Sequence, residues 1–331
     1  MLHLPLAFLG VSSVHAVGQA LVDGVVSGGR YAIVGVSIGL IFGTTGRFHF
    51  AFATTFTLCA YVASILAGAA GLPWPIATLA GVMAAAALGV IVEAAIYRPI
   101  ELRAPGDPAL AVFVASLGVT IVGENVIRLI WSSNSRNVNG FASHPFRVAG
   151  VTVTTMDLVV VGTAIAVAVA FSGVMRYTRL GRQIKATRAD PDLASTVGVR
   201  VRRVILQVFA IGSAAGGLGA VLDGMKFAVV PDMGTTPLLY GMVVAFLAGT
   251  RSDPIIVALA GLLVGVVQSL STLWVSDQLS IVAVFGVLIV FLSYRSLTIG
   301  FARYSGSPLR VLARILIPSG RREVTERAGG R

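Results

Sequence analysis

The sequence predicts an all-α fold, a polytopic bundle of transmembrane helices, from three observations. Of its 331 residues, 56% are hydrophobic and only 12% are charged, whereas about a quarter of a soluble chain is charged. The mean hydropathy is +0.89. Apolar segments of membrane-spanning length recur between residues 20 and 294. Helices suit them because about 20 apolar residues in a helix cross the hydrocarbon core and satisfy every backbone polar group.

Composition divides the chain into three parts: an apolar N-terminal segment at 1–19, a transmembrane domain at 20–294, and a basic tail at 295–331. The net charge of +11 is concentrated in a central polar loop, 176–203, and in the tail. Basic loops of this kind are typical of the cytoplasmic side of membrane proteins, so we expect no nucleic-acid partner. The N-terminus lacks a basic start and does not read as a cleaved signal peptide.

About nine spans are predicted, with a range of eight to ten. The apolar segments lie at about 20–43, 48–69, 74–97, 109–131, 158–175, 204–227, 238–250, 255–274 and 279–294. Placing Arg47, Arg98, the central loop and the tail on the inside requires an external N-terminus. A span within residues 2–18 would make ten. The segment at 238–250 is too short unless its helix begins near Gly234, and if it were only re-entrant the tail would lie outside.

Small residues at four-residue intervals predict two ridges where another helix can approach closely. The first comprises Gly35, Gly39 and Gly43, and the second Gly212, Gly216, Ala220 and Gly224.

Few ionisable residues fall within the spans, and such groups usually face a cavity or one another. Arg30 either lines a cavity that attracts a carboxylate or pairs with Asp23, one heptad away. Glu124 with Arg128, and Asp223 with Lys226, lie near outer ends of spans with spacings that favour a local ion pair or snorkelling to the interface. We expect Glu93 to order the inner end of its helix, one turn before Arg98.

The central loop contains signals for a short helix. Asp190 followed by Pro191 suits an N-cap and first helical position, and Gly198 suits a left-handed C-terminal cap. Helical spacing places Leu193, Ala194 and Val197 on one face. A helix this short needs a partner surface, although an ordinary solvated basic loop is the alternative.

The loop resembles, at matching intervals, the cytoplasmic coupling loop of branched-chain amino acid ABC transporter permeases. The matching positions are Gly181, Arg182, Ala186, Asp190, Ala194 and Gly198. The stretches 28–32 and 216–219, and Glu93 with Arg98-Pro99, also resemble that family. The resemblance implies a type II ABC importer permease fold in which these positions, with Leu193 and Val197, dock on an ATPase subunit.

The same resemblance implies partners and a location. They are cytoplasmic ATPase subunits, a second permease (a paralogue or another copy) and an extracytoplasmic substrate-binding protein. The chain would lie in the bacterial cytoplasmic membrane with its C-terminus inside. It would carry no cofactor, because the partner subunits use the ATP.

Two departures from the family pattern bear on the substrate. Relatives have Asn-Phe-Ala-His-Gly where this chain has His49 to Ala53, and Gly-Gly-x-Gly where it has Ala248 to Arg251. Both lie near helix breaks, where transport pathways are often built. The translocation pathway is therefore predicted to include Arg30, His49, Phe50, Ala51 and Phe52. The expected substrates are branched-chain or related small amino acids or amides.

No enzymatic or metal-binding pattern is present. The chain has no Walker motif, its four histidines lack metal-ligand spacing, and Cys59 is its only cysteine. The alternative functions are a self-sufficient channel or secondary transporter, or an ABC permease for urea or a simple sugar. The capped loop helix and the scarcity of buried carboxylates favour an importer permease over the self-sufficient transporter.

Overall fold

The computed structural model describes residues 11–274, except 133, 139, 142, 149, 250 and 251, together with 279, 281–282, 284–291 and 293. The first compact unit extends to Phe285, and residues from Gly286 onward belong to a second. In the first half the elements are α1 (Val11–Thr45), α2 (Phe52–Gly68), α3 (Trp74–Ile91), the π-helix η2 (Val92–Tyr97), α4 (Arg98–Arg103) and α5 (Pro108–Trp131). They are followed by β1 (Pro145–Val148), β2 (Val151–Thr154), α6 (Thr155–Tyr177), α7 (Arg179–Ala189), α8 (Pro191–Thr196), α9 (Val201–Lys226), α10 (Thr235–Ala248) and α11 (Pro254–Ser271).

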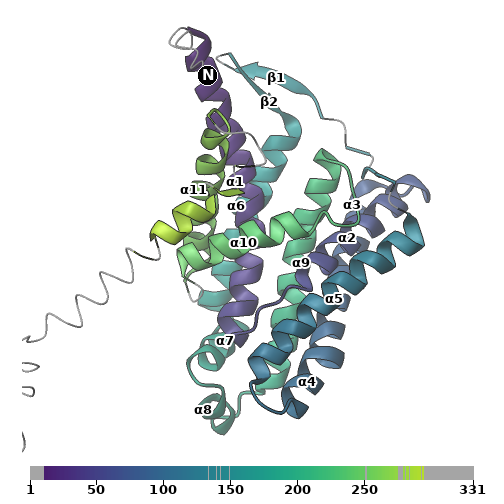
Figure 1. Cartoon of the computed structure of the whole chain (residues 1–331), viewed down its shortest axis with the longest axis vertical. Coiled ribbons are helices and arrows are strands. Elements are labelled where there is room, and N and C mark those ends of the chain that lie inside the picture. The colour runs from purple at the N-terminus through teal and green to yellow at the C-terminus, as the bar shows by residue number, and fades with distance from the viewer. Residues whose placement is uncertain are drawn as a thin grey trace, which may run out of the picture. The chain divides into compact units, whose positions relative to one another are not determined.

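Helix α1 is the central helix of the first unit and contacts α6, α7, α9, α10 and α11 (Figure 1). Its 35 residues give a length of about 52 Å. The helix ends before Gly46, whose φ of +69° turns the chain. Because α1 is continuous from Val11, the described part of the N-terminal segment does not form a separate span. The predicted start at residue 20 was too late.

A crossing of α1 and α11 depends on glycines outside the two predicted ridges. A Cβ added at Gly28 would lie 2.7 Å from the Cα of Leu262, and one at Gly265 would collide with the backbone of Gly28. Backbones can meet this closely only where side chains are absent. The available signals were Gly24 and Gly28 on α1, and Gly261 and Gly265 on α11, each pair four residues apart.

The two predicted ridges are buried but have different partners. On α1, a Cβ at Gly35 would collide with Val244 of α10, and Gly39 faces Ala245. On α9, a Cβ at Gly212 would lie 2.7 Å from Ile41 Cγ1. Farther along that ridge, Gly216 receives the ring of Phe52, and Gly224 faces Val138 and Val229. The α9 ridge therefore packs against several segments rather than against one helix.

Six helical segments of the described chain are long and apolar enough to cross a membrane. They are His15–Thr45, Trp74–Arg103, Pro108–Trp131, Thr155–Tyr177, Val201–Lys226 and Pro254–Ser271. Large apolar side chains such as Leu79, Ile121, Ile165 and Leu259 are more than half exposed on the outer faces of α3, α5, α6 and α11. Exposed apolar faces of this extent are expected where helices contact lipid. This is a multi-pass membrane protein.

The predicted count of nine spans is not confirmed. Helix α10 does begin next to Gly234, but its 14 residues cover only about 21 Å, less than the roughly 30 Å hydrocarbon core. In Figure 1 it runs across the bundle, and its Gly241 packs against Val34 and Ile38, in the C-terminal half of α1. Helix α2 is also shorter than the usual span. The ninth predicted segment lies partly outside the described residues.

The bundle has two ends. One carries the antiparallel hairpin of β1 and β2, which lies in the connection between α5 and α6. The hairpin leads directly into α6, where Thr154 and Asp157 form a capping box. The other end carries α7 and α8, which form the central loop. We call these the hairpin end and the α7–α8 end.

Candidate functional site

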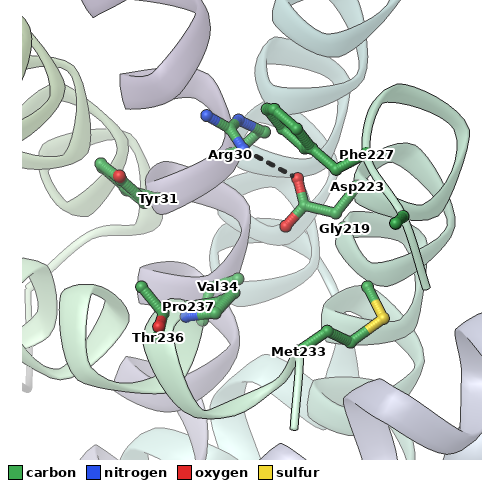
Figure 2. A pocket seen from close by; sticks show the side chains of 10 residues that line it. Arg30, Tyr31, Val34, Gly219, Asp223, Phe227, Met233, Thr236 and Pro237 are labelled. Carbon is green, nitrogen blue, oxygen red and sulfur yellow. Dashed lines mark hydrogen bonds and ion pairs between the residues drawn. The ribbon is translucent and has the colours of Figure 1, made fainter. Parts of the chain in front are cut away.

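A cavity of about 260 Å³ lies between α1, the end of α9 and the start of α10 (Figure 2). Its wall is formed by Arg30, Tyr31, Val34, Gly219, Asp223, Phe227, Ala228, Met233, Thr236 and Pro237. Asp223 stands three residues before the end of α9, whereas α8 precedes the start of that helix. The cavity therefore lies toward the hairpin end of the bundle.

Arg30 and Asp223 are the charged groups of this wall. Arg30 Nη1 donates to Asp223 Oδ1 at 3.2 Å, and Nη2 donates to Ser27 Oγ at 3.0 Å. The guanidinium carbon lies 4.8 Å from the ring centroid of Phe227, within the range of a cation–π contact. Arg30 Nε is buried and has no hydrogen-bond partner. One donor of the guanidinium is therefore unsatisfied in this arrangement.

These partners differ from those that local spacing suggested. Arg30 lines a cavity, which was one of the two alternatives predicted for it. Its charged partner is Asp223 and not Asp23. Asp23 instead accepts a hydrogen bond from Gln19 at 3.0 Å. Lys226 pairs with Asp157 of α6 rather than with Asp223.

The second local pair was also replaced by a longer-range contact. Glu124 of α5 accepts a hydrogen bond from Thr235 at 2.9 Å, and no ion pair joins it to Arg128 among the described residues. Spacing along one helix could not reveal a partner that lies on another.

The segment 49–52 does not line the Arg30 cavity. Ala51 and Phe52 are fully buried, and the Phe52 ring fits against Gly216 of α9. His49 Nδ1 lies 2.9 Å from the hydroxyl of Tyr97, and its Nε2 is buried without a partner. His49 also borders a separate, much smaller cavity. The structure thus does not bring Arg30 and this segment into one site.

A buried charge cluster joins the end of α1 to η2 and α4. Arg47 Nη1 donates to both carboxylate oxygens of Glu93 at 2.8 Å, and Arg47 Nη2 bonds Glu101. Glu93 therefore connects η2 to the segment that follows α1, and Arg98 forms an ion pair with Glu101 at 3.7 Å. Pro99 has no backbone N–H to donate to the preceding turn, and the wider π turn of η2 accommodates this missing hydrogen bond.

At the α7–α8 end, the predicted caps of the short helix are present. Asp190 Oδ1 accepts from the amides of Asp192 and Leu193, at 2.9 and 3.0 Å. Gly198 has a φ of +87°, a conformation that favours glycine. The predicted common face is wrong in one respect. Ala194 is buried within the chain at 3% exposure, whereas Leu193 and Val197 are 63% and 73% exposed.

The other residues assigned to this loop divide in the same way. Gly181 is buried, and a Cβ there would collide with Val174 O. Ala186 is half-buried, and Arg182 is exposed. Nearby, Arg176 and Ser172 bond Asp253, which caps α11. Partial burial acts to raise the pKa of Asp253. The Ile255 amide, Arg176 and Ser172 outweigh it, so this pKa lies below its usual range.

Comparison with known proteins places this arrangement in a family. Residues 20–293 match the model of the branched-chain amino acid transport system permease component. The chain belongs to this family. That match covers α2 to α11 and most of α1, so it includes both the Arg30 cavity and the α7–α8 segment.

Named relatives agree with this assignment. The permease is 26% identical to the high-affinity branched-chain amino acid transport system permease protein BraD of Pseudomonas aeruginosa, over 84% of this chain and 93% of that protein. It is 26% identical to LivH of Escherichia coli K12, which bears the same description, over 83% and 92%. A shorter match, 34% identical over 28% of the chain and 26% of the relative, is to the nucleoside ABC transporter permease protein NupB of Lactococcus lactis.

Among solved structures, that of PsaBC from Streptococcus pneumoniae in complex with Fab aligns with a TM-score of 0.49 and 16% identity. The alignment covers 85% of this chain and 92% of that chain.

Proposed function

We propose that this permease is the membrane subunit of an ABC importer for branched-chain or related small amino acids. Separate ATPase subunits would drive it, an extracytoplasmic binding protein would deliver the substrate, and a second permease would complete the pathway. The family match over residues 20–293 carries this proposal. The chain itself would hold no cofactor, because ATP would be bound by its partners.

The α7–α8 segment is the proposed contact with the ATPase. Leu193 and Val197 leave apolar surface exposed on a short polar helix whose backbone is fixed by Asp190 and Gly198. A helix with fixed ends and an exposed apolar pair can enter a groove on a partner with little loss of conformational entropy. Ala194 would support this helix from within the chain.

The orientation follows from charge. Arg179, Arg182, Lys185, Arg200 and Arg202 surround this segment, and basic loops remain on the cytoplasmic side. The α7–α8 end would therefore face the cytoplasm of a bacterial inner membrane. The Arg30 cavity, toward the other end, would be nearer the exterior. The C-terminal tail, which lies outside the described residues, is also proposed to be cytoplasmic because of its charge.

Uptake by the complete importer in proteoliposomes tests this function. We expect ATP-dependent accumulation of labelled leucine, isoleucine and valine when the binding protein is present, and none without ATP. The panel also contains a nucleoside, urea and a simple sugar. Uptake of one of these with no uptake of the amino acids would overturn the proposed substrate class. Accumulation without ATPase subunits would instead support a self-sufficient transporter.

A further inference from the structure

We propose that the Arg30 cavity is a binding site for zwitterionic amino acids, in which Arg30 binds the α-carboxylate and Asp223 binds the α-ammonium. This inference rests on the proposed function and specifies how the substrate is recognised within the membrane. The charged pair stands at one edge of a mostly apolar wall (Figure 2). A small solute with two opposite charges and an apolar side chain is complementary to that arrangement.

The pair is close enough to act as one recognition unit but is not saturated. A single contact of 3.2 Å joins Arg30 Nη1 to Asp223 Oδ1, in contrast to the two contacts between Arg47 and Glu93. Arg30 Nε has no partner, and Asp223 Oδ2 accepts no hydrogen bond from the described residues. A guanidinium presents several donors in a fixed fork that suits a carboxylate. A modest rotation of Arg30 would direct the unsatisfied edge toward a ligand.

The two charges favour a zwitterion over either ion alone. An isolated anion or cation entering this apolar region would leave an unbalanced charge, which is costly away from water. A ligand with both charges adds no net charge to the pair. In an amino acid both groups are attached to the same carbon, so they can meet two side chains that already touch. The cavity thus discriminates by the pairing of charges as well as by size.

The remaining wall suits an apolar side chain. Val34, Phe227, Met233 and Pro237 provide aliphatic and aromatic surface, and Met233 is a flexible side chain that adapts to differently branched ligands. Thr236 and Tyr31 carry hydroxyls in the wall, and that of Tyr31 bonds Gln268. A volume of about 260 Å³ lies just below the roughly 300 Å³ of the smallest drug-binding sites. It therefore fits a solute of amino-acid size.

The test measures binding of labelled leucine to the complete importer in nanodiscs and its uptake in proteoliposomes. We compare Arg30→Gln, Asp223→Asn and the double variant carrying both. Loss of one charge-assisted contact should weaken leucine binding about ten- to a hundredfold. The double variant should bind no better than the weaker single variant, because both ligand contacts are gone.

A purely structural ion pair gives the opposite result. Each single variant would leave one charge unpaired, and removal of the second would restore folding and uptake toward the wild-type level. The matched control is Lys226→Gln with Asp157→Asn, an ion pair nearby that does not line the cavity. There we expect the double variant to recover leucine binding. Recovery in the Arg30–Asp223 double variant as well would overturn the inference.

Competing analogues provide a second readout that does not depend on stability. Leucinamide lacks the carboxylate, and 4-methylpentanoate lacks the ammonium group. Both should compete with leucine at the wild-type site at least about tenfold more weakly than unlabelled leucine, since a site built for polar groups rejects analogues that lack them. Competition by either analogue as strong as that by leucine would also overturn the inference. If the wild-type importer transports no amino acid at all, the proposed function fails first, and that outcome is distinct from either result above.

Discussion

At the scale of single residues, charges inside this bundle are paired across elements. Arg30 of α1 meets Asp223 of α9, Lys226 of α9 meets Asp157 of α6, and Arg47 meets Glu93 of η2. Each pairing joins segments that are distant in the sequence. A charge left without a partner inside the bundle would be costly. Removing either member of a pair should therefore destabilise the protein.

The most buried of these pairs should dominate stability. Arg47 and Glu93 have side-chain exposures of 8% and 4%. Glu93→Ala removes two hydrogen bonds from the buried guanidinium of Arg47, which keeps Glu101 as a partner. The substitution should lower the free energy of unfolding by about 3–5 kcal/mol. Thermal unfolding of the detergent-solubilised protein measures this loss. Arg176→Ala, at an exposed ion pair with Asp253, is the control and should cost about 0–1 kcal/mol. Equal effects would show that the buried cluster has no special role.

At the scale of elements, small residues determine how α1 packs. Gly24 and Gly28 face Gly261 and Gly265 of α11, while Gly35 and Gly39 face α10. The central helix can therefore be surrounded closely on several sides. This close approach also places Arg30 beside the end of α9 and the start of α10, where the cavity forms.

The α1–α11 crossing provides a direct test of that packing. Gly265→Val places a side chain against the backbone of Gly28, which cannot move as a flexible side chain could. We expect loss of the folded, monodisperse protein in size-exclusion chromatography. Gly162→Val on α6 is the control, because a Cβ there meets nothing within 4 Å. The packing account fails if both variants are recovered at the wild-type yield.

In the α7–α8 segment Ala194 is buried, whereas Leu193 and Val197 are exposed. Substitutions at the buried and the exposed positions should therefore have different effects. Leu193→Glu with Val197→Glu should leave the protein folded but reduce co-purification of the ATPase, since charges replace the exposed apolar surface. Ala194→Trp and Gly198→Val should act through the fold of the segment, because one residue is buried and the other has φ of +87°.

Arg200→Ala, an exposed basic residue next to the segment, is the control for all three. It should retain the ATPase. Full retention by the Leu193–Val197 double variant would show that this helix face is not the contact.

At the scale of the whole molecule, the two ends of the bundle should lie on opposite sides of the membrane. The hairpin end carries the exposed Ser143, and the α7–α8 end carries Asp190. Single cysteines at these positions should react differently with a membrane-impermeant maleimide in intact spheroplasts. We expect labelling at 143 and protection at 190 until the cells are opened. The buried Cys59 is replaced by serine in both. Labelling of 190 in intact spheroplasts would reverse the proposed orientation.

The sequence by itself determined the class of the protein and much of its local structure. Hydropathy located most of the helices, the Asp190–Pro191 pair and Gly198 located the ends of α8, and four-residue glycine spacing identified surfaces of close approach. These signals are local, because a helix cap or a periodic face depends on residues within one or two turns.

Only the tertiary structure decided which groups meet. Spacing along one helix offered Asp23 as one possible partner for Arg30 and Lys226 as one for Asp223, but packing brought Asp223 to Arg30 from 193 positions away. Packing also buries Ala194 while Leu193 stays exposed. Helix α1 is longer than predicted, and α10 is too short to span the membrane. The physical reason is that a buried charge takes the partner that helix packing places beside it. That packing depends on contacts between distant segments, which no local pattern in the sequence records.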